Sequence, residues 1–246
     1  MTTAIIIPAR YGSSRLEGKP LIEVEGKPII QWVWEKASMA TLADLIIVAT
    51  DDKRIYNCVK SFGGDVEMTS PNHKCGSDRI QEVMERHPEI THVVNLQGDE
   101  PLITPESIDA VMRNVLEDSE ADISTLLRIL KDESEINNPN LVKCVVDNRG
   151  FALYFSRSKI PYERNTDVAT FYGHLGIYGY KREALKRMTK LSQSQLEVTE
   201  SLEQLRALQN GMKIKTTVVD FVPVGIDTKD DLEKFKEIVK SQITCN

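Results

Sequence analysis

The sequence predicts an α/β fold, in which helices flank a mostly parallel, twisted sheet and a β-hairpin is inserted in the second half. In the first half, short runs of branched apolar residues alternate with segments of helical periodicity. This alternation indicates βαβ units, which wind right-handed around a parallel sheet. A turn-forming tetrapeptide, 147–150, lies between two apolar segments and indicates the hairpin.

Three strands and four helices are predicted in the first half. Each strand is a short apolar segment, and each helix has an apolar face or begins at a capping residue. Pro105 suits the first position of a helix, where its missing N–H would have no partner in any case. The predicted strands are 4–8, 45–50 and 90–97, and the predicted helices are 29–37, 55–62, one capped by Ser77 that ends near Arg86, and one that begins at Thr104-Pro105.

The second half is predicted to mix strands and helices. We expect the hairpin strands at 141–146 and 151–157, a polar loop at 158–170, a strand at 174–180, a helix from about Leu196 to Asn210 ended by Gly211, a strand at 213–219, and a helix at 229–241 capped by Thr228. No break in composition marks a linker. We therefore expect a single domain over residues 1–246.

Composition excludes several classes of protein. Hydrophobic residues make up 41% of the 246 and charged residues 28%, which excludes a disordered chain. The net charge of −6 argues against a broad surface for nucleic acid or anionic membranes. The four cysteines are scattered without a CxxC pair, so neither a zinc site nor a disulfide framework is expected. With no leader peptide recognised and no apolar run near the roughly 20 residues of a membrane span, we expect a cytoplasmic enzyme or binding protein.

The segment after the first strand, Pro-Ala-Arg-Tyr-Gly-Ser-Ser-Arg-Leu-Glu-Gly-Lys-Pro at 8–20, carries three cations: Arg10, Arg15 and Lys19. Ligands of parallel α/β sheets bind beyond the carboxyl ends of the strands, and small residues let backbone N–H groups approach an anion. The glycine spacing and Pro20 do not fit a Walker P-loop, and GxGxxG is absent. A solvated turn is the simpler alternative, but three cations at a strand end favour a polyphosphate site.

Two aspartates are candidates for a metal site. Asp99 follows the third predicted strand, and Asp227 follows a late β segment. Magnesium takes carboxylate oxygens, water and substrate phosphates as ligands. Each aspartate could instead simply form a turn or cap a helix. This simpler role is especially favoured for Asp227, because Thr228 starts a helix. Spacing alone does not bring positions 99 and 227 together.

The motif Pro-Ala-Arg-Tyr-Gly-Ser-Ser-Arg-x-x-Gly-Lys-Pro-Leu resembles the opening motif of the 3-deoxy-manno-octulosonate cytidylyltransferase (CMP-Kdo synthetase) family. Two positions depart from the family pattern: Cys75 stands where serine is more common, and Gly173 where lysine is common. Further matches follow in the family's order over nearly the whole chain, at 49–52, 76–79, 95–101, 152–157, 173–178, 202–206 and 225–228.

The resemblance implies a Rossmann-like fold of the nucleotide-diphospho-sugar transferase type and a homodimer that uses CTP and Mg²⁺. The anomeric hydroxyl of 3-deoxy-D-manno-octulosonate (Kdo) would attack the α-phosphorus of CTP, giving CMP-Kdo and pyrophosphate for lipopolysaccharide biosynthesis. Residues 131–200 would carry the hairpin, sugar-binding residues and dimer contacts. On the second hairpin strand, Phe151, Leu153 and Phe155 alternate onto one face, which a second chain could cover.

The resemblance also assigns the site residues. Asp99 and Asp227 would hold the metal, while Arg10, Arg15 and Lys19 would stabilise the triphosphate. The nucleotide would contact Pro8, Ala9, Arg10, Gly12, Ser13, Arg15, Lys19, Gly76, Ser77, Arg79 and Gln97. The sugar acid would contact Arg157, His174, Tyr178, Glu203 and Gln204.

Simpler alternatives exist for several of these residues. Arginine is the natural two-point partner of a carboxylate, which favours Arg157. Ser77 could simply cap a helix, and His174 could be structural. Glu203 and Gln204 share one face of the predicted helix with Glu200, which could be a solvated face. The other histidines, His73, His87 and His92, are expected at the surface.

Three other functions remain open from the sequence. One is a cytidylyltransferase for a related acid sugar, 8-amino-Kdo or sialic acid. Another is an NAD-dependent oxidoreductase, against which the missing GxGxxG argues. The third is a nucleotide-binding regulator without catalysis, which would bind CTP and release no pyrophosphate.

Overall fold

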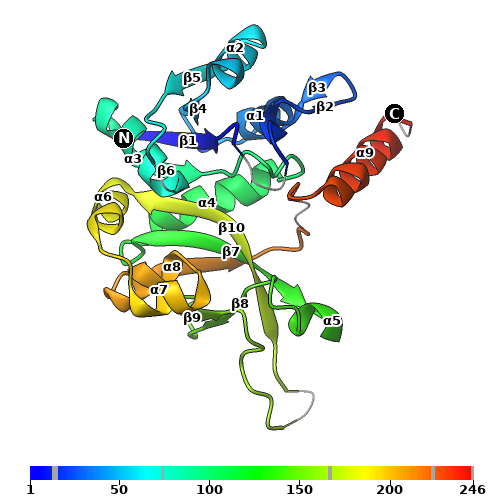
Figure 1. Ribbon diagram of the computed structural model, residues 1–246. Helices are drawn as coiled ribbons and strands as arrows, with labels where there is room; N and C mark the ends of the chain where they lie inside the picture. Colours follow the sequence, from blue (N-terminus) through cyan, green and yellow to red (C-terminus); the bar gives the residue numbers. More distant parts are fainter. Residues whose placement is uncertain (13–15, 74, 166–167, 223–224, 245–246) are drawn as a thin grey trace. The chain divides into compact units, whose positions relative to one another are not determined.

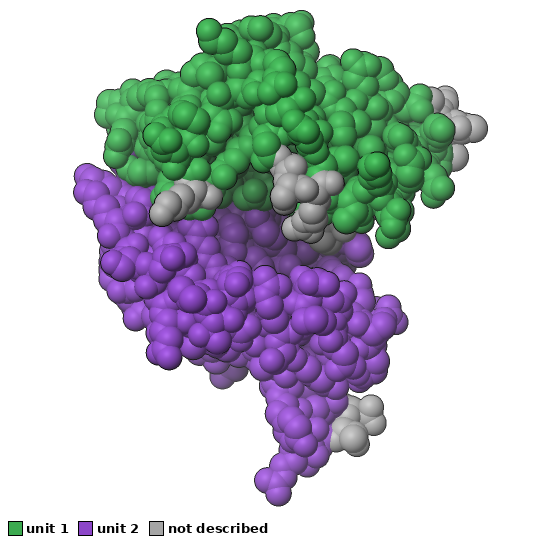
Figure 2. All heavy atoms as spheres, viewed as in Figure 1, with its two compact units in different colours: residues 1–91, 95–109, 223–246 green, residues 92–94, 110–222 purple. Residues whose placement is uncertain are grey.

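The computed structural model describes residues 1–12, 16–73, 75–165, 168–222 and 225–244, and it confirms the predicted α/β fold (Figure 1). The chain divides into two compact units (Figure 2). Unit 1 comprises Met1–Thr91, Asn95–Asp109 and Pro223–Asn246, and unit 2 comprises His92–Val94 and Ala110–Val222. Among the described residues, no helix has the length and apolar character needed to cross a bilayer.

The strands and helices follow in chain order. The strands are β1 (Thr2–Ala9), β2 (Glu23–Val24), β3 (Lys27–Pro28), β4 (Leu45–Thr50), β5 (Asp65–Met68), β6 (Ile90–Asn95), β7 (Ile123–Leu130), β8 (Lys143–Val146), β9 (Ala152–Ser156), β10 (Phe171–Lys181) and β11 (Ile214–Val218). The helices are η1 (Lys19–Leu21), α1 (Ile29–Ser38), α2 (Lys53–Ser61), α3 (Gly76–Arg86), α4 (Pro105–Glu117), α5 (Glu133–Ile136), α6 (Arg182–Lys190), α7 (Gln195–Glu200), α8 (Gln204–Gln209) and α9 (Lys229–Thr244).

Unit 1 is built on parallel strands. β1 pairs with β4, and β4 pairs with β5, so that Ala9 lies opposite Thr50 and Thr50 opposite Met68. The three strands therefore end at the same edge of the sheet. The interior of β1 is fully buried, which explains its continuous apolar run, Ala-Ile-Ile-Ile. Beyond its end, the chain can present side chains and backbone N–H groups to a ligand.

Unit 2 contains antiparallel pairs. β7 runs antiparallel to β10 and parallel to β11, and β8 pairs with both β10 and β9. The predicted hairpin is confirmed as β8–β9. Its turn is fixed by Asp147, whose Oδ1 accepts from the backbone N–H groups of Arg149 and Phe151 at 2.8 Å each. Gly150 supplies the left-handed conformation that the turn needs, with φ +77°.

The expected apolar face of the hairpin is wrong. Phe151 and Phe155 are buried within the chain, and only Leu153 remains exposed, at 61%. Ala152 pairs with Val146 and Tyr154 with Val145, so Leu153 is the extra residue of a β-bulge. A bulge breaks the alternation of side chains between the two faces of a strand, and the sequence pattern did not reveal it.

The single helix expected at 196–210 is also wrong, because the structure has α7 and α8 in its place. Ser194 starts α7 with a capping box to Glu197, and Ser201 ends it in the left-handed conformation with φ +52°. The direction of the chain changes there. Glu200, Glu203 and Gln204 therefore do not share one helix face.

The predicted caps give a mixed result. The Oγ1 atoms of Thr104 and Thr228 each accept from the backbone N–H three residues on, at 3.2 Å, which confirms both caps. Ser77 is not a cap, because α3 already begins at Gly76 and Cys75 holds the N-cap position. The surface position expected for His92 is wrong as well: its strand, β6, is buried along most of its length.

Candidate active site

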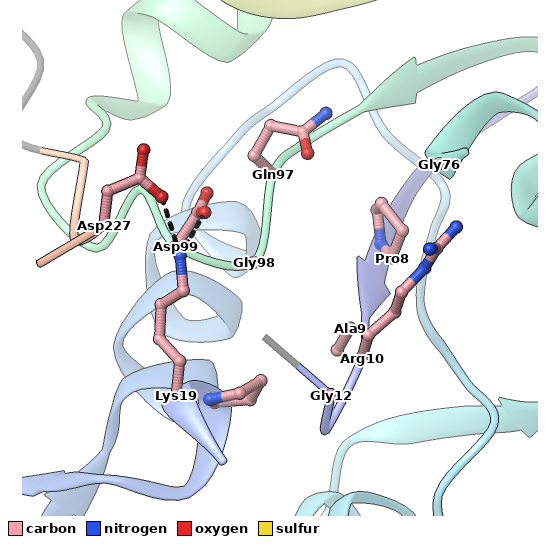
Figure 3. A pocket seen from close by; sticks show the side chains of 11 residues that line it. Pro8, Ala9, Arg10, Gly12, Lys19, Gly76, Gln97, Gly98, Asp99 and Asp227 are labelled. Atoms are coloured by element: carbon pink, nitrogen blue, oxygen red, sulfur yellow. Dashed lines mark hydrogen bonds and ion pairs between the residues drawn. The ribbon is translucent and has the colours of Figure 1, made fainter. Parts of the chain in front are cut away.

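A cavity of about 330 Å³ opens in unit 1 next to the end of β1 (Figure 3). The walls come from the segment after β1, the start of α3, the loop after β6 and the segment before α9. The lining residues are Pro8, Ala9, Arg10, Gly12, Lys19, Pro20, Gly76, Gln97, Gly98, Asp99 and Asp227. The structure thus brings most of the predicted nucleotide residues together with both predicted metal ligands.

Lys19 lies between the two aspartates. Its Nζ is 2.8 Å from Asp99 Oδ2 and 3.1 Å from Asp227 Oδ1 (Figure 3). Burial by itself lowers the pKa of Lys19, but the charges of these carboxylates and the hydrogen bonds to them outweigh burial and raise it. Two carboxylates from distant parts of the sequence therefore converge on one position that holds a positive charge.

Glu100 adds a third carboxyl group beside this pair. Burial, together with the charges of Asp99 and Asp227, raises the pKa of Glu100 to about 7. Near neutral pH its carboxyl group is therefore only partly ionised. The excess of acidic groups at this end of the cavity favours a cation there.

Arg10 gives another part of the cavity wall a positive charge. Its Nη2 is buried and has no hydrogen-bond partner in the part of the chain that the structure describes, and the side chain extends along the cavity wall beside Gly76 (Figure 3). A buried donor without an acceptor costs about 1–3 kcal/mol, and more when it is charged. The Arg10 side chain lines the cavity, so an anion there would compensate its charge.

Gly98 is a lining residue that sequence reasoning did not single out. A Cβ at this position would lie 3.0 Å from the backbone oxygen of Pro8, which is too close for most side chains. Only glycine lets the loop that carries Asp99 pack so tightly against the end of β1. The sequence signal for it is the glycine between the two polar residues of the motif Gln97-Gly98-Asp99.

Ser77 and Arg79 lie in the interior of unit 1, and neither lines the cavity. The Arg79 guanidinium is fully buried and bonds to Asp51 Oδ2, at 2.9 Å, and to Thr69 Oγ1. It therefore joins α3 to the residues that follow β4 and β5. Nucleotide contacts by Ser77 and Arg79 stay predictions, while Ser13 and Arg15 lie outside the described residues.

In unit 2, His174 and Tyr178 extend from the same face of β10, as predicted. Their ring centroids are 5.3 Å apart, and His174 Nε2 is 3.0 Å from Thr125 Oγ1. Burial lowers the pKa of His174 to about 3, so its imidazole is neutral at physiological pH. Burial and the charges of nearby groups, among them Glu203, raise the pKa of Tyr178. Glu203 thus belongs to the same region, and Gln204, one residue further on, is buried.

Arg157 is held by backbone carbonyls of unit 2. Its Nε donates to the oxygen of Glu200 at 2.7 Å, and its Nη1 and Nη2 donate to the oxygens of Pro139 and Ser201. The Glu200 carboxylate in turn accepts from the N–H of Arg157 and from Ser156 Oγ. This network joins the end of β9 to the turn between α7 and α8. Pairing of Arg157 with a sugar carboxylate stays a prediction.

Known proteins resemble the chain over nearly its whole length. The family model for cytidylyltransferases matches residues 4–214. The 3-deoxy-manno-octulosonate cytidylyltransferase of Fusobacterium nucleatum is 47% identical over 96% of both chains. The mitochondrial enzyme of that name from Arabidopsis thaliana is 46% identical over 96% of this chain and 83% of its own.

Solved structures show the same relationship. A CMP:2-keto-3-deoxy-manno-octonic acid synthetase complexed with CTP has a TM-score of 0.95 and 42% identity, covering 98% of this chain and all of its own. A 4-diphosphocytidyl-2C-methyl-D-erythritol synthase from Anaerococcus prevotii shares the fold alone, with a TM-score of 0.64 and 13% identity over 97% of this chain and 96% of its own. The chain belongs to the 3-deoxy-manno-octulosonate cytidylyltransferase family, as its motifs predicted.

Proposed function

We propose that the protein transfers CMP from CTP to Kdo, forming CMP-Kdo and pyrophosphate in the cytoplasm for lipopolysaccharide biosynthesis. The observation that carries this proposal is the cavity of unit 1, in which an unsatisfied guanidinium and a pair of carboxylates lie beyond a parallel strand. The names of the curated relatives and the CTP bound to the similar solved structure support it.

The positive groups of the cavity would bind the triphosphate. Arg10 would bring its guanidinium to the phosphates from the cavity wall, where Lys19 carries a full charge. Gly12 lines the same wall without a side chain to keep a ligand away from its backbone. Arg15, by its position in the motif, would add a third cation. Transfer to an α-phosphorus depends mainly on positioning and on charge compensation, which these groups would provide.

We propose Mg²⁺ as the cofactor, held by Asp99 and Asp227. Their oxygens are the hard donors that magnesium prefers, and they already converge on the Lys19 ammonium. The described residues contain no group of three or more His, Cys, Asp or Glu side chains arranged to hold a metal ion, so water and substrate oxygens would supply the other ligands. When bound, the metal supplies charge neutralisation and lowers the pKa of a coordinated hydroxyl.

The remaining residues would select the two substrates. Gln97, whose Nε2 donates to Asn95 Oδ1 at 3.1 Å, presents its amide at the cavity wall where it could bind the base or ribose. In unit 2, Arg157 would bind the sugar carboxylate, and Glu203 and Gln204 its hydroxyls. His174 and Tyr178 would contact the sugar as neutral groups, because burial keeps both uncharged.

We further propose that the protein is a homodimer whose interface includes the hairpin region of unit 2. Several large apolar side chains of that unit are exposed, among them Ile129, Leu153 and Tyr162. Covering them with a second chain would remove apolar surface from water. Sedimentation at micromolar concentration should show a dimer, and a monomer alone would contradict this part of the proposal.

A pyrophosphate-release assay tests the main proposal. With CTP and Mg²⁺, Kdo should support the fastest release, while UTP and sialic acid should support little. Preference for sialic acid or 8-amino-Kdo would move the protein to the alternative substrate. Binding of CTP without release with any sugar acid would indicate a regulator. Chelation of divalent cations should stop the reaction, and unchanged turnover would exclude Mg²⁺ as the cofactor.

A further inference from the structure

Tyr11 and Gly18, two described residues of the segment that would bind the triphosphate, contact each other. The N–H of Gly18 donates to the oxygen of Tyr11 at 2.9 Å. Gly18 has φ +66°, and a Cβ there would lie 3.1 Å from the Tyr11 ring. The ring therefore packs directly against Gly18, where only glycine suits both the backbone conformation and the space.

The position of Gly18 affects the cavity because Lys19 follows it. Gly18 is the N-cap of η1, and its oxygen accepts from the N–H of Leu21 at 2.8 Å. Lys19 is the first residue of that helical turn and reaches Asp99 and Asp227. Any shift of the Tyr11–Gly18 contact would move the backbone from which the Lys19 ammonium extends.

Arg54, from the first turn of α2, holds the Tyr11 ring. The Cζ atom of its guanidinium lies 3.2 Å from the centroid of the ring. The guanidinium is itself fixed by Asp52, with Nε to Oδ1 at 2.9 Å and Nη2 to Oδ2 at 2.6 Å. Asp52 also caps α2 by accepting from the N–H of Arg54 at 2.8 Å. The arginine is thus anchored to the turn that follows β4, and its planar face is left for the ring.

We propose that the Asp52–Arg54 pair holds the Tyr11 ring against Gly18 in one stack, and thereby keeps Lys19 in place at the cavity before the nucleotide arrives. Arg54 does not line the cavity, so it acts as a positioning residue and not as a catalytic one. A binding residue that is already held in position loses less conformational entropy when the ligand binds, which increases affinity without a new contact. That the ligand is a nucleotide rests on the proposed function.

The first test does not depend on the proposed function. The amide hydrogens of Gly18 and Leu21 should exchange faster in Arg54→Ala than in the unaltered protein, because the Tyr11 ring loses its support. Arg86→Ala is the matched control, since Arg86 is an exposed arginine of unit 1 that also pairs with carboxylates. Equal exchange in the unaltered protein and Arg54→Ala would overturn the stack, and so would the same acceleration in Arg86→Ala.

The second test measures nucleotide binding. Arg54→Ala should raise the KM for CTP about two- to fivefold with kcat within about twofold, as expected for loss of one exposed cation–π contact. Tyr11→Phe should retain the CTP affinity and Tyr11→Leu should lose it. The double variant Arg54→Ala/Tyr11→Leu should be no worse than Tyr11→Leu alone.

The outcomes separate the two proposals. If the unaltered protein binds no CTP, the proposed function fails, and the exchange of Gly18 still decides on the stack. If the unaltered protein binds CTP and Arg54→Ala has the same KM, the positioning role is overturned. A fall in kcat alone, at constant KM, would also contradict it, because Arg54 would then affect the reacting groups and not the binding segment.

Discussion

The cavity of unit 1 and the hairpin end of unit 2 both gather cations and carboxylates, but they use them differently. Among the described residues of unit 1, Arg10 Nη2 has no hydrogen-bond partner, and Lys19 Nζ bonds to the carboxylates of Asp99 and Asp227, which other cations can occupy. In unit 2, every guanidinium nitrogen of Arg157 donates to a backbone oxygen, and buried Lys143 donates to three. Donors used within the chain hold the fold, whereas open donors are available to a ligand.

The largest effect is expected at the carboxylate pair. Asp99→Ala or Asp227→Ala should lower kcat by about a hundredfold or more, because each would remove one of the two proposed oxygen ligands of Mg²⁺. Pyrophosphate release at saturating Mg²⁺ measures the loss. Asp230→Ala, an exposed aspartate in the first turn of α9, is the control and should be active. Near-normal Mg²⁺-dependent turnover in either cavity variant would exclude the two-carboxylate site.

A smaller but clear effect is expected at Arg10. Arg10→Ala should weaken CTP binding about ten- to hundredfold, since hydrogen bonds to charged groups contribute about 1.5–3 kcal/mol. The variant should not lose thermal stability, because Nη2 has no hydrogen-bond partner among the described residues. Calorimetric titration with CTP and with CMP provides the measurement. Equal losses for both nucleotides would mean that Arg10 does not bind the β- and γ-phosphates.

Arg157 tests the prediction for unit 2. Arg157→Lys keeps the charge and loses the planar fork, so we expect a lower free energy of unfolding, by about 1 kcal/mol, as carbonyl partners are lost. If Arg157 also binds the sugar carboxylate, the KM for Kdo should rise at least about tenfold with the Kd for CTP unchanged. Lower stability with an unchanged KM for Kdo would make Arg157 structural alone. Weakened binding of both substrates would contradict its assignment to the sugar.

A further effect concerns pH. Burial lowers the pKa of His174 to about 3 from an ordinary 6.5, so below pH 6.5 the unfolded chain binds a proton that the folded chain does not. The contribution of His174 to the free energy of unfolding is therefore complete above pH 6.5. It is lost as the pH falls towards 3, by at most about 1.4 kcal/mol per pH unit. Urea unfolding at about pH 7 and about pH 5 should show a smaller loss for His174→Gln than for the unaltered protein. Equal losses would contradict the low pKa.

Local patterns in the sequence were sufficient for much of the fold. The apolar runs of β1 and β4 and the turn of the hairpin are dictated by neighbouring residues, and so are the caps at Thr104 and Thr228. The pattern failed where one residue changed the geometry. Ser201 divides a helix that periodicity alone would continue, and the bulge at Leu153 moves one side chain off its expected face.

The sequence by itself determined the family, the α/β class and the residues of the segment after β1, because motifs and periodicity are properties of neighbouring positions. Only the tertiary structure decided which distant groups meet. It brought Asp99 and Asp227 to one ammonium, placed Arg10 at the wall of the cavity, and placed Arg79 and Arg157 in contacts with their own chain. A side chain's role depends on whether its donors are satisfied within the fold, and those partners lie far away in the sequence.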